Sequence, residues 1–404
     1  MANAETAAAV QGWIREKIFL GETVGDYLKE RLTAPIIASM VVVAGGLAVI
    51  AYRFYAGLGA ATNLSQNQPW GIWIGFDMMT GICLAAGGFT IGAAVEIFGL
   101  EDYHAIERPA ILTGFLGYIL AIIGLIVDLG KPWNMVQVTM RNGTQSVLFE
   151  VAWCVMCYTS VLALEFAVPF FEWLGWKKVY EVLKKALLGL TVLSVMFSTM
   201  HQSALGSLFI IAPGRLHPLW YSESIFVFFF VSAIIAGISM VIVESSISHT
   251  VFAKQFQGQH VDADALTLGL GKAGAVVMFA YFFLKLQGVV DNHAVEFIGK
   301  GFYGKWWLVE MLGFVLFPTM LYAWGARNRR VKAVRWAAGI AVLGIILNRL
   351  NISVIAFNYK LTENRYYPSW MEVLVSVSLV IIGVFAFRWI VHRMPVLHPL
   401  ADEN

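Results

Sequence analysis

The chain has 404 residues, of which 59% are hydrophobic and 13% are charged, and its formal net charge is +2. Soluble domains carry about 25% charged residues, so this composition excludes an ordinary soluble fold. We expect an integral membrane protein whose partners include the lipid bilayer and no nucleic acid.

The N-terminal segment, residues 1–33, mixes charged side chains with apolar ones such as Trp13, Ile14 and Phe19. This pattern favours an amphipathic helix from Thr6 to Arg31 that lies on the cytoplasmic membrane surface. A solvated tail is the alternative. No apolar signal-peptide core precedes the charges, so the first span is expected to direct its own insertion.

Ten apolar segments follow, each long enough to cross a hydrocarbon core of about 30 Å as a helix. They are Ala34–Tyr55, Trp70–Phe98, Ala110–Leu129, Val147–Trp173, Val182–Phe209, Tyr221–Phe252, Leu266–Val290, Trp306–Trp324, Val334–Phe357 and Trp370–Val391. The connections are short, so no soluble domain is inserted. The fold class is therefore an all-α membrane protein with about ten transmembrane helices.

The distribution of Lys and Arg predicts the orientation, because cytoplasmic loops carry an excess of these residues. The side that holds the N-terminus has eighteen of them and the opposite side has seven. Both termini are thus expected in the cytoplasm, and the membrane is expected to be the bacterial inner membrane.

Four ionisable residues fall in the periplasmic third of spans two to five, where a charged side chain costs about 3 kcal/mol unless it is paired or hydrated. Asp77 lies roughly 10 Å below the outer end of its span. Asp128 ends the third span, Glu150 opens the fourth, and His201 lies about three turns from the outer end of the fifth. We expect these groups to converge in one pocket.

Such a pocket suits a quinone, whose two carbonyl oxygens need hydrogen-bond donors and whose reduction needs two protons. Asp and His are suited to deliver them. Asp77, Asp128 and His201 are the expected catalytic residues, and Trp133, Glu150 and Arg215 are expected to complete the quinone site. The alternative is a polar network that only fixes helix packing.

A second polar set lies deeper toward the cytoplasm and includes Glu165 and Glu244. Thr191, Ser194, Ser198 and His201 share one face of the fifth span, because each helical residue advances about 100°. The pattern predicts a hydrated proton route from the cytoplasm, which would make the reaction electrogenic. Local pairing, with hydroxyls bonded to their own helix, is the alternative.

The later spans hold Lys285, Glu310, Asn348, Arg349 and Asn351. Their opposite charges favour structural pairing, with a proton path as the alternative reading.

Only His201 among the eight histidines lies clearly at depth. A bis-histidine haem needs two facing imidazoles, and no cysteine-rich cluster motif is present, so we expect neither haem nor an iron–sulfur cluster in this chain, and no metal site.

Several stretches together resemble the NrfD/PsrC-like membrane subunits of polysulfide reductase and related complexes. They are PWGIWIGFD (69–77), DLGKPWN (128–134), LFEVAWCVMCY (148–158), HQSALGSL (201–208), RLHPLWYS (215–222) and NRLNIS (348–353). HQSALGSL and RLHPLWYS resemble most the membrane subunits of periplasmic quinone reductase complexes and of hydrogenase-2-type complexes.

The resemblance implies two four-helix bundles, helices two to five and six to nine, flanked by helices one and ten. The corresponding regions are 34–56, 70–210, 221–357 and 370–404. It also implies a menaquinone site near the periplasm in the first bundle, beside an iron–sulfur subunit. Through that subunit it implies a multihaem cytochrome c and a molybdopterin-like subunit, or a nickel–iron hydrogenase.

The leading hypothesis is a menaquinone reductase activity carried out within a multisubunit complex. A membrane subunit of a periplasmic uptake hydrogenase is the alternative within the family. A secondary transporter is the alternative from another class, since transporters also place charges near the midplane. A purely structural anchor has no need of so many buried ionisable groups.

Overall fold

The computed structural model describes residues 11–397 apart from 142, 254, 256–261 and 362–364. In this part of the chain the regular elements are all helices, and ten helical segments are long and apolar enough to cross a membrane. Most of their bounds differ by a few residues from those expected from the apolar runs, but the third span begins at Glu101, nine residues before the expected Ala110. The expectation of an all-helical, ten-span membrane protein is confirmed.

The first five spans contain both unbroken and interrupted helices. The first span is α3 (Ala34–Ala56). The second is interrupted and consists of η1 (Trp73–Thr80), α5 (Gly81–Leu84), α6 (Gly87–Gly92) and η2 (Ala93–Ile97). The third is η3 (Glu101–Tyr103) with α7 (His104–Asp128), the fourth is α9 (Val147–Leu174), and the fifth is α10 (Lys177–Ile210).

The sixth span is α11 (Ile225–Val251) and the seventh is α12 (Ala263–Asp291). The eighth consists of α13 (Gly301–Leu308), η6 (Val309–Leu316) and α14 (Phe317–Arg327). The ninth is α15 (Val331–Leu350) with η7 (Asn351–Ile355), and the tenth is α16 (Trp370–Val391). Shorter helices are α2 (Val24–Arg31), α4 (Leu58–Ala61), η4 (Pro132–Asn134), α8 (Met135–Arg141) and η5 (Val295–Phe297).

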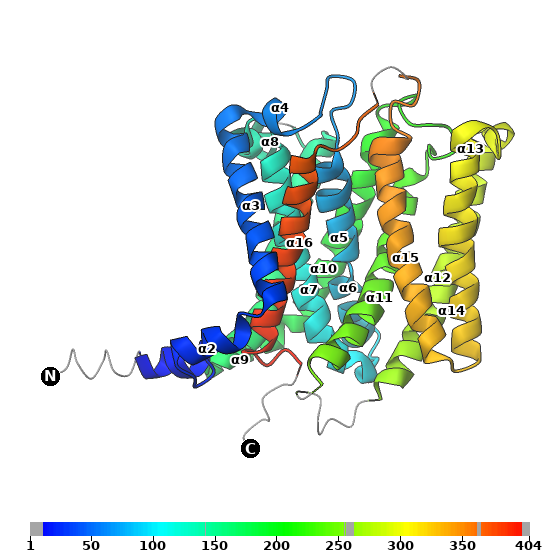
Figure 1. Cartoon of the computed structure of the whole chain (residues 1–404). Coiled ribbons are helices and arrows are strands. Elements are labelled where there is room, and N and C mark those ends of the chain that lie inside the picture. The colour runs from blue at the N-terminus through cyan, green and yellow to red at the C-terminus, as the bar shows by residue number, and fades with distance from the viewer. Residues whose placement is uncertain (1–10, 142, 254, 256–261, 362–364, 398–404) are drawn as a thin grey trace.

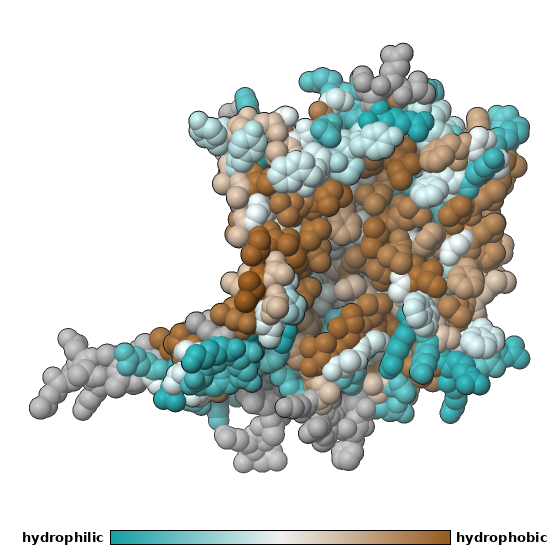
Figure 2. Space-filling view, in the orientation of Figure 1, coloured by the Kyte–Doolittle hydropathy of each residue, from teal (hydrophilic) through white to brown (hydrophobic). Residues whose placement is uncertain are grey.

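The spans stand side by side, and α2 lies across one end of them (Figure 1). We call this end the α2 end and the opposite one the far end. A broad apolar band separates two polar ends on the visible face (Figure 2), as expected for a surface in contact with hydrocarbon.

The second span and α11 form the centre of the molecule. In each of them, 67% of the most apolar 18-residue stretch is buried, whereas only 11% of the corresponding stretch of α3 is buried. Close approach of these two helices requires glycine, because a Cβ on Gly237 would lie 2.8 Å from the carbonyl carbon of Ala86. Residues from the first five and the later spans therefore meet along this contact.

The second, eighth and ninth spans include π-helical stretches, η1 and η2, η6, and η7. Such widened turns are rare and occur frequently at functional sites. η1 carries Asp77, η6 carries Glu310, and η7 begins at Asn351.

The N-terminal segment is divided, and it is not the single helix expected from Thr6 to Arg31; residues 1–10 lie outside the described part. Residues 11–17 are helical, the chain turns at Leu20 and Gly21 with positive φ angles of 54° and 85°, and α2 follows. Arg393 donates hydrogen bonds to the carbonyl of Ile18 and fastens the segment to the end of α16.

Candidate functional site

Asp77 lies in η1 between the third and tenth spans. The Ser376 hydroxyl of α16 donates a hydrogen bond of 2.6 Å to its Oδ2 atom. On the other side, a Cβ on Gly124 of α7 would lie 3.0 Å from the Asp77 Cβ, so α7 passes close to the aspartate. The carboxyl is therefore buried and held by a neighbour from a distant part of the sequence.

Asp128, the last residue of α7, is also buried and interacts electrostatically with Asp77. Its charge further interacts with Glu372 of α16 and with the guanidinium of Arg53. Arg53 donates a hydrogen bond to the carbonyl of Leu129, which fixes it at the end of α7. The far end thus holds several carboxyl groups and a compensating cation from α3.

Glu372 is part of this cluster although it lies near the end of its helix. Ser369 and Glu372 form a capping box at the start of α16. Tyr366 donates a hydrogen bond to the Glu372 side chain and accepts one of 3.0 Å from the Ile72 amide. Burial and the adjacent carboxylate raise the pKa of Tyr366, so its phenol stays a hydrogen-bond donor.

His201 lies in a separate buried setting on α10. Its side chain is 0% exposed, and the imidazole lies close to the backbone of Val151 in α9, but neither ring nitrogen makes a hydrogen bond of ordinary geometry to the described residues. The imidazole lies 5.9 Å from the ring of Tyr118 in α7, which in turn lies 4.6 Å from the ring of Tyr158 in α9. The next residue, Gln202, donates to the carbonyl of Ile82 in the second span.

The described contacts therefore divide the expected pocket into two parts that share α7. Asp77 lies beside Gly124 of α7, and His201 lies beside Tyr118 of the same helix. Tyr118 and Gly124 are six positions apart on α7, which corresponds to a rise of about 9 Å along the helix axis.

The three remaining residues of the expected quinone site lie further out. Glu150 is half-buried at the start of α9. Trp133 in η4 is 71% exposed. Arg215 is exposed and donates to Asn358 at 3.3 Å, so its described partner belongs to the loop after η7.

A row of buried polar groups leads from His201 toward the α2 end. Ser198 lies one turn below His201 and close to the phenols of Tyr118 and Tyr158. Ser194 donates to Glu165 of α9 at 3.4 Å, and Thr191 follows beside the same carboxyl group. The stripe expected on α10 is thus buried and faces α7 and α9.

Glu107 extends this row to the α2 end and was not expected from the sequence. It is buried near the start of α7, 2.6 Å from the Nδ1 atom of His104, and its charge reaches Glu165. Glu244, which was expected in the row, instead accepts a hydrogen bond of 2.8 Å from Ser248 on its own helix. Its described contacts do not join it to Glu165.

The family model "Polysulphide reductase, NrfD" matches residues 60–359. The probable Ni/Fe-hydrogenase 2 b-type cytochrome subunit of Escherichia coli K12 is 34% identical over 383 residues, covering 92% of this chain and 96% of that protein.

Two proteins of Nitratidesulfovibrio vulgaris are also similar. One, whose name states no function, is 44% identical over 377 residues and covers 93% of this chain and 97% of its own length. The integral membrane subunit of menaquinone reductase is 27% identical over 384 residues, which cover 88% of this chain and 89% of that protein. These matches confirm the resemblance seen in the motifs, and the chain belongs to the NrfD family of multi-pass membrane proteins.

Proposed function

We propose that this chain is the quinone-binding membrane subunit of a respiratory complex and passes electrons from a periplasmic iron–sulfur partner to menaquinone. The names of two relatives, a menaquinone reductase subunit and a hydrogenase 2 subunit, support this class of complex. The far end then faces the periplasm and both termini lie in the cytoplasm, in agreement with the Lys and Arg distribution.

The observation that carries the proposal is the buried imidazole of His201, because neither of its ring nitrogens has a hydrogen bond of ordinary geometry to the described residues. A buried polar group without a hydrogen bond costs about 1–3 kcal/mol, so such groups call for a ligand or a functional role. A quinone carbonyl would supply an acceptor for the imidazole N–H. The buried Asp77 carboxyl would serve the opposite carbonyl, because both side chains have neighbours on α7, at Tyr118 and Gly124.

The spacing suits a quinone because its two carbonyls point in opposite directions. We propose that the headgroup lies between the two side chains, with one hydrogen bond at each carbonyl. The surface in Figure 2 is recessed between α16 and α15, in front of the second span that carries Asp77. We propose this recess as the lateral entry from the lipid.

Reduction adds two electrons and two protons to the quinone. The partner's iron–sulfur cluster supplies the electrons. His201 donates its N–H proton to the first carbonyl oxygen while its other ring nitrogen takes up a proton, so the imidazole stays neutral, and Asp77 donates the second proton to the other carbonyl oxygen, which gives the quinol. Ser376 positions the Asp77 carboxyl, and Asp128 returns a proton to it.

His201 recovers its proton through the row formed by Ser198, Ser194, Thr191 and Glu165, which starts at Glu107. We propose that these protons come from the cytoplasm, so turnover is electrogenic. Each charge moved across the membrane then corresponds to about 2.3 kcal/mol per 100 mV. Glu244 is left outside this row, because its described partner lies on α11.

We also propose that helices two to five form the bundle with the quinone site, that helices six to nine form the second bundle, and that helices one and ten flank them. Trp133 and Arg215 are exposed at the far end, which suits contact with the iron–sulfur subunit. We expect a multihaem cytochrome c and a molybdopterin-like subunit, or a nickel–iron hydrogenase, beyond it, and no haem in this chain.

The experiment that tests the proposal is menaquinone reduction by the purified complex with His201→Leu. We expect turnover to be lost while the complex still assembles. The matched control is His392→Leu, which changes a histidine near the α2 end whose Nδ1 lies 2.7 Å from a backbone carbonyl of its own helix. Unchanged turnover in His201→Leu would refute the assignment.

A further inference from the structure

A second group of buried charges lies among the later helices, away from the proposed quinone site. Glu310 in η6 is 1% exposed and is surrounded by donors. It accepts hydrogen bonds from Trp220 at 2.6 Å, Asn348 at 2.7 Å and Asn351 at 2.5 Å. Lys285 of α12 is equally buried, with its ammonium nitrogen 3.7 Å from a Glu310 oxygen.

Arg349 of α15 adds a second cation to this group. Its guanidinium donates to Asn348, to the Ser232 hydroxyl of α11, and to the Sγ atom of Cys83 in the second span. It also lies 3.9 Å from the centre of the Phe229 ring. Arg349 thus connects the Glu310 group to the helices of the proposed quinone site.

The charge balance of the group distinguishes Lys285 from Arg349. One carboxylate faces two cations, so full ionisation leaves one uncompensated positive charge, which is costly in a buried setting. A guanidinium is not deprotonated in proteins, whereas a lysine ammonium exchanges its proton. Loss of one proton from Lys285 leaves a balanced pair of Glu310 and Arg349.

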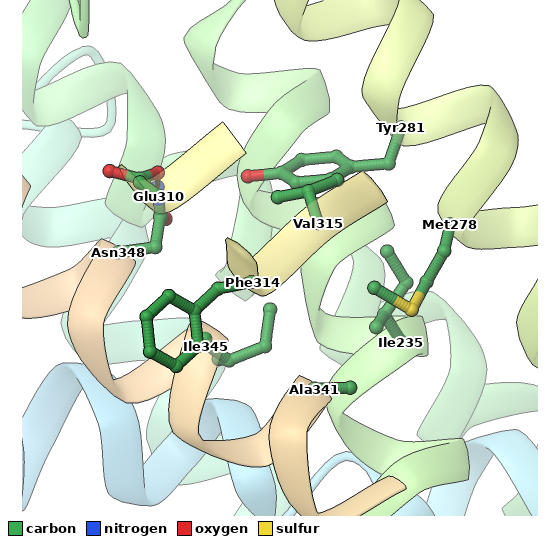
Figure 3. A pocket seen from close by; sticks show the side chains of 10 residues that line it. Ile235, Met278, Tyr281, Glu310, Phe314, Val315, Ala341, Ile345 and Asn348 are labelled. Atoms are coloured by element: carbon green, nitrogen blue, oxygen red, sulfur yellow. Dashed lines mark hydrogen bonds between the residues drawn. The ribbon is translucent and has the colours of Figure 1, made fainter. Parts of the chain in front are cut away.

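A small cavity adjoins the carboxylate. It has a volume of about 10 Å³, close to the least that admits one water molecule. Glu310, Asn348 and Tyr281 line it, and the Tyr281 hydroxyl points toward Glu310 (Figure 3). These polar groups provide the two to four partners that a buried water needs.

We propose that Lys285 and Glu310, with one water molecule in the adjoining cavity, form a proton-exchange site in the later helices. In the exchange step an N–H bond of the Lys285 ammonium breaks, the nitrogen keeps the electron pair, and the proton passes to the Glu310 oxygen 3.7 Å away. Glu310, which lines the cavity, then releases the proton to the water and is again a carboxylate. The other charged or titratable groups that interact with the pair are Arg349 and Tyr281, and Cys83 in turn contacts Arg349. The site requires no quinone and is therefore independent of the proposed function.

Infrared spectroscopy of the purified complex tests this proposal. The carboxylate band of Glu310 is identified as the band lost in Glu310→Gln, or, if that variant does not assemble, as the band altered in Lys285→Met. We expect this band to shift reversibly between about pH 5 and pH 11 in the unmodified protein, as Lys285 gains and loses its proton; this range includes the ordinary lysine pKa of about 10.4. In Lys285→Met the band should not move with pH.

The matched control is Lys272→Met, an exposed lysine on the same helix, which should leave the shift unchanged. A Glu310 band that stays constant over the whole pH range in the unmodified protein would overturn the proposal. So would a shift that persists in Lys285→Met.

Discussion

The two halves of the molecule hold buried charges in opposite ways. Around Asp77, Asp128 and His201, acidic groups and an imidazole have few internal partners. Around Glu310, every carboxylate oxygen accepts a hydrogen bond and two cations lie near. An unsatisfied polar group suits a site that receives an external ligand, whereas a satisfied network suits stability or internal exchange.

The largest expected effect is loss of folding when the satisfied network is broken. Glu310→Leu leaves the Lys285 ammonium unpaired and the donors from Trp220 and Asn348 without an acceptor. Removing one partner of a buried pair costs about 3–5 kcal/mol, so we expect little assembled protein. Yield and thermal unfolding in detergent measure this, with the exposed Glu296→Leu as control. A stable Glu310→Leu variant would show that the network is not structural.

The second largest effect is expected for His201, which belongs to the group with few internal hydrogen bonds. His201→Leu removes a group without internal hydrogen bonds, so stability should change little. Quinone reduction should fall about 100-fold or more, the usual contribution of a positioned proton donor. Steady-state turnover and thermal unfolding of the same sample separate the two results. A large loss of stability would place His201 with the structural groups instead.

A third prediction concerns His217 in the loop between α10 and α11, which is packed against the rings of Trp220, Tyr303 and Tyr359. Burial lowers the pKa of His217 to about 4, so the folded protein favours the neutral imidazole. Its stabilising effect is complete above about pH 6.5 and is lost as the pH falls from there toward 4.

Between pH 6.5 and 5.5 this loss is about 1.4 kcal/mol at most, because one pKa unit corresponds to that energy. Thermal unfolding measured at both pH values checks it. In His217→Phe the same change of pH should have a smaller effect. An equal effect in both proteins would mean that His217 does not control this dependence.

The smallest expected effect is on the row of hydroxyls below His201. Ser194→Ala removes a hydrogen bond to Glu165, worth about 1 kcal/mol, which corresponds to roughly a fivefold slower proton-limited turnover. Thr199→Val is the control, because the Thr199 hydroxyl bonds only to a carbonyl of its own helix in the described contacts. Equal rates in the two variants would argue against the row as a proton route.

The spans and their bounds could be predicted from sequence because length and hydropathy determine what crosses a bilayer. The buried face of α10 could be predicted as well, since it depends only on helical periodicity within one segment. Contacts between helices could not. Nothing in the spacing of Arg53 or Ser376 indicates that one lies beside Asp128 and the other beside Asp77.

Two other features show the same limit. Glu107 precedes the apolar run of its span, so the sequence predicts a surface residue. In the structure its neighbours bury it. The separation of His201 from Asp77 depends on the faces that α7 presents to the second span and to α10, and a single sequence does not specify these faces.

A structure of the complex with a bound menaquinone analogue tests the central claim most directly. We expect the headgroup to bind beside α7, with one carbonyl within hydrogen-bonding distance of the His201 imidazole and the other within reach of the Asp77 carboxyl. A headgroup bound elsewhere, with neither side chain in contact, would contradict it.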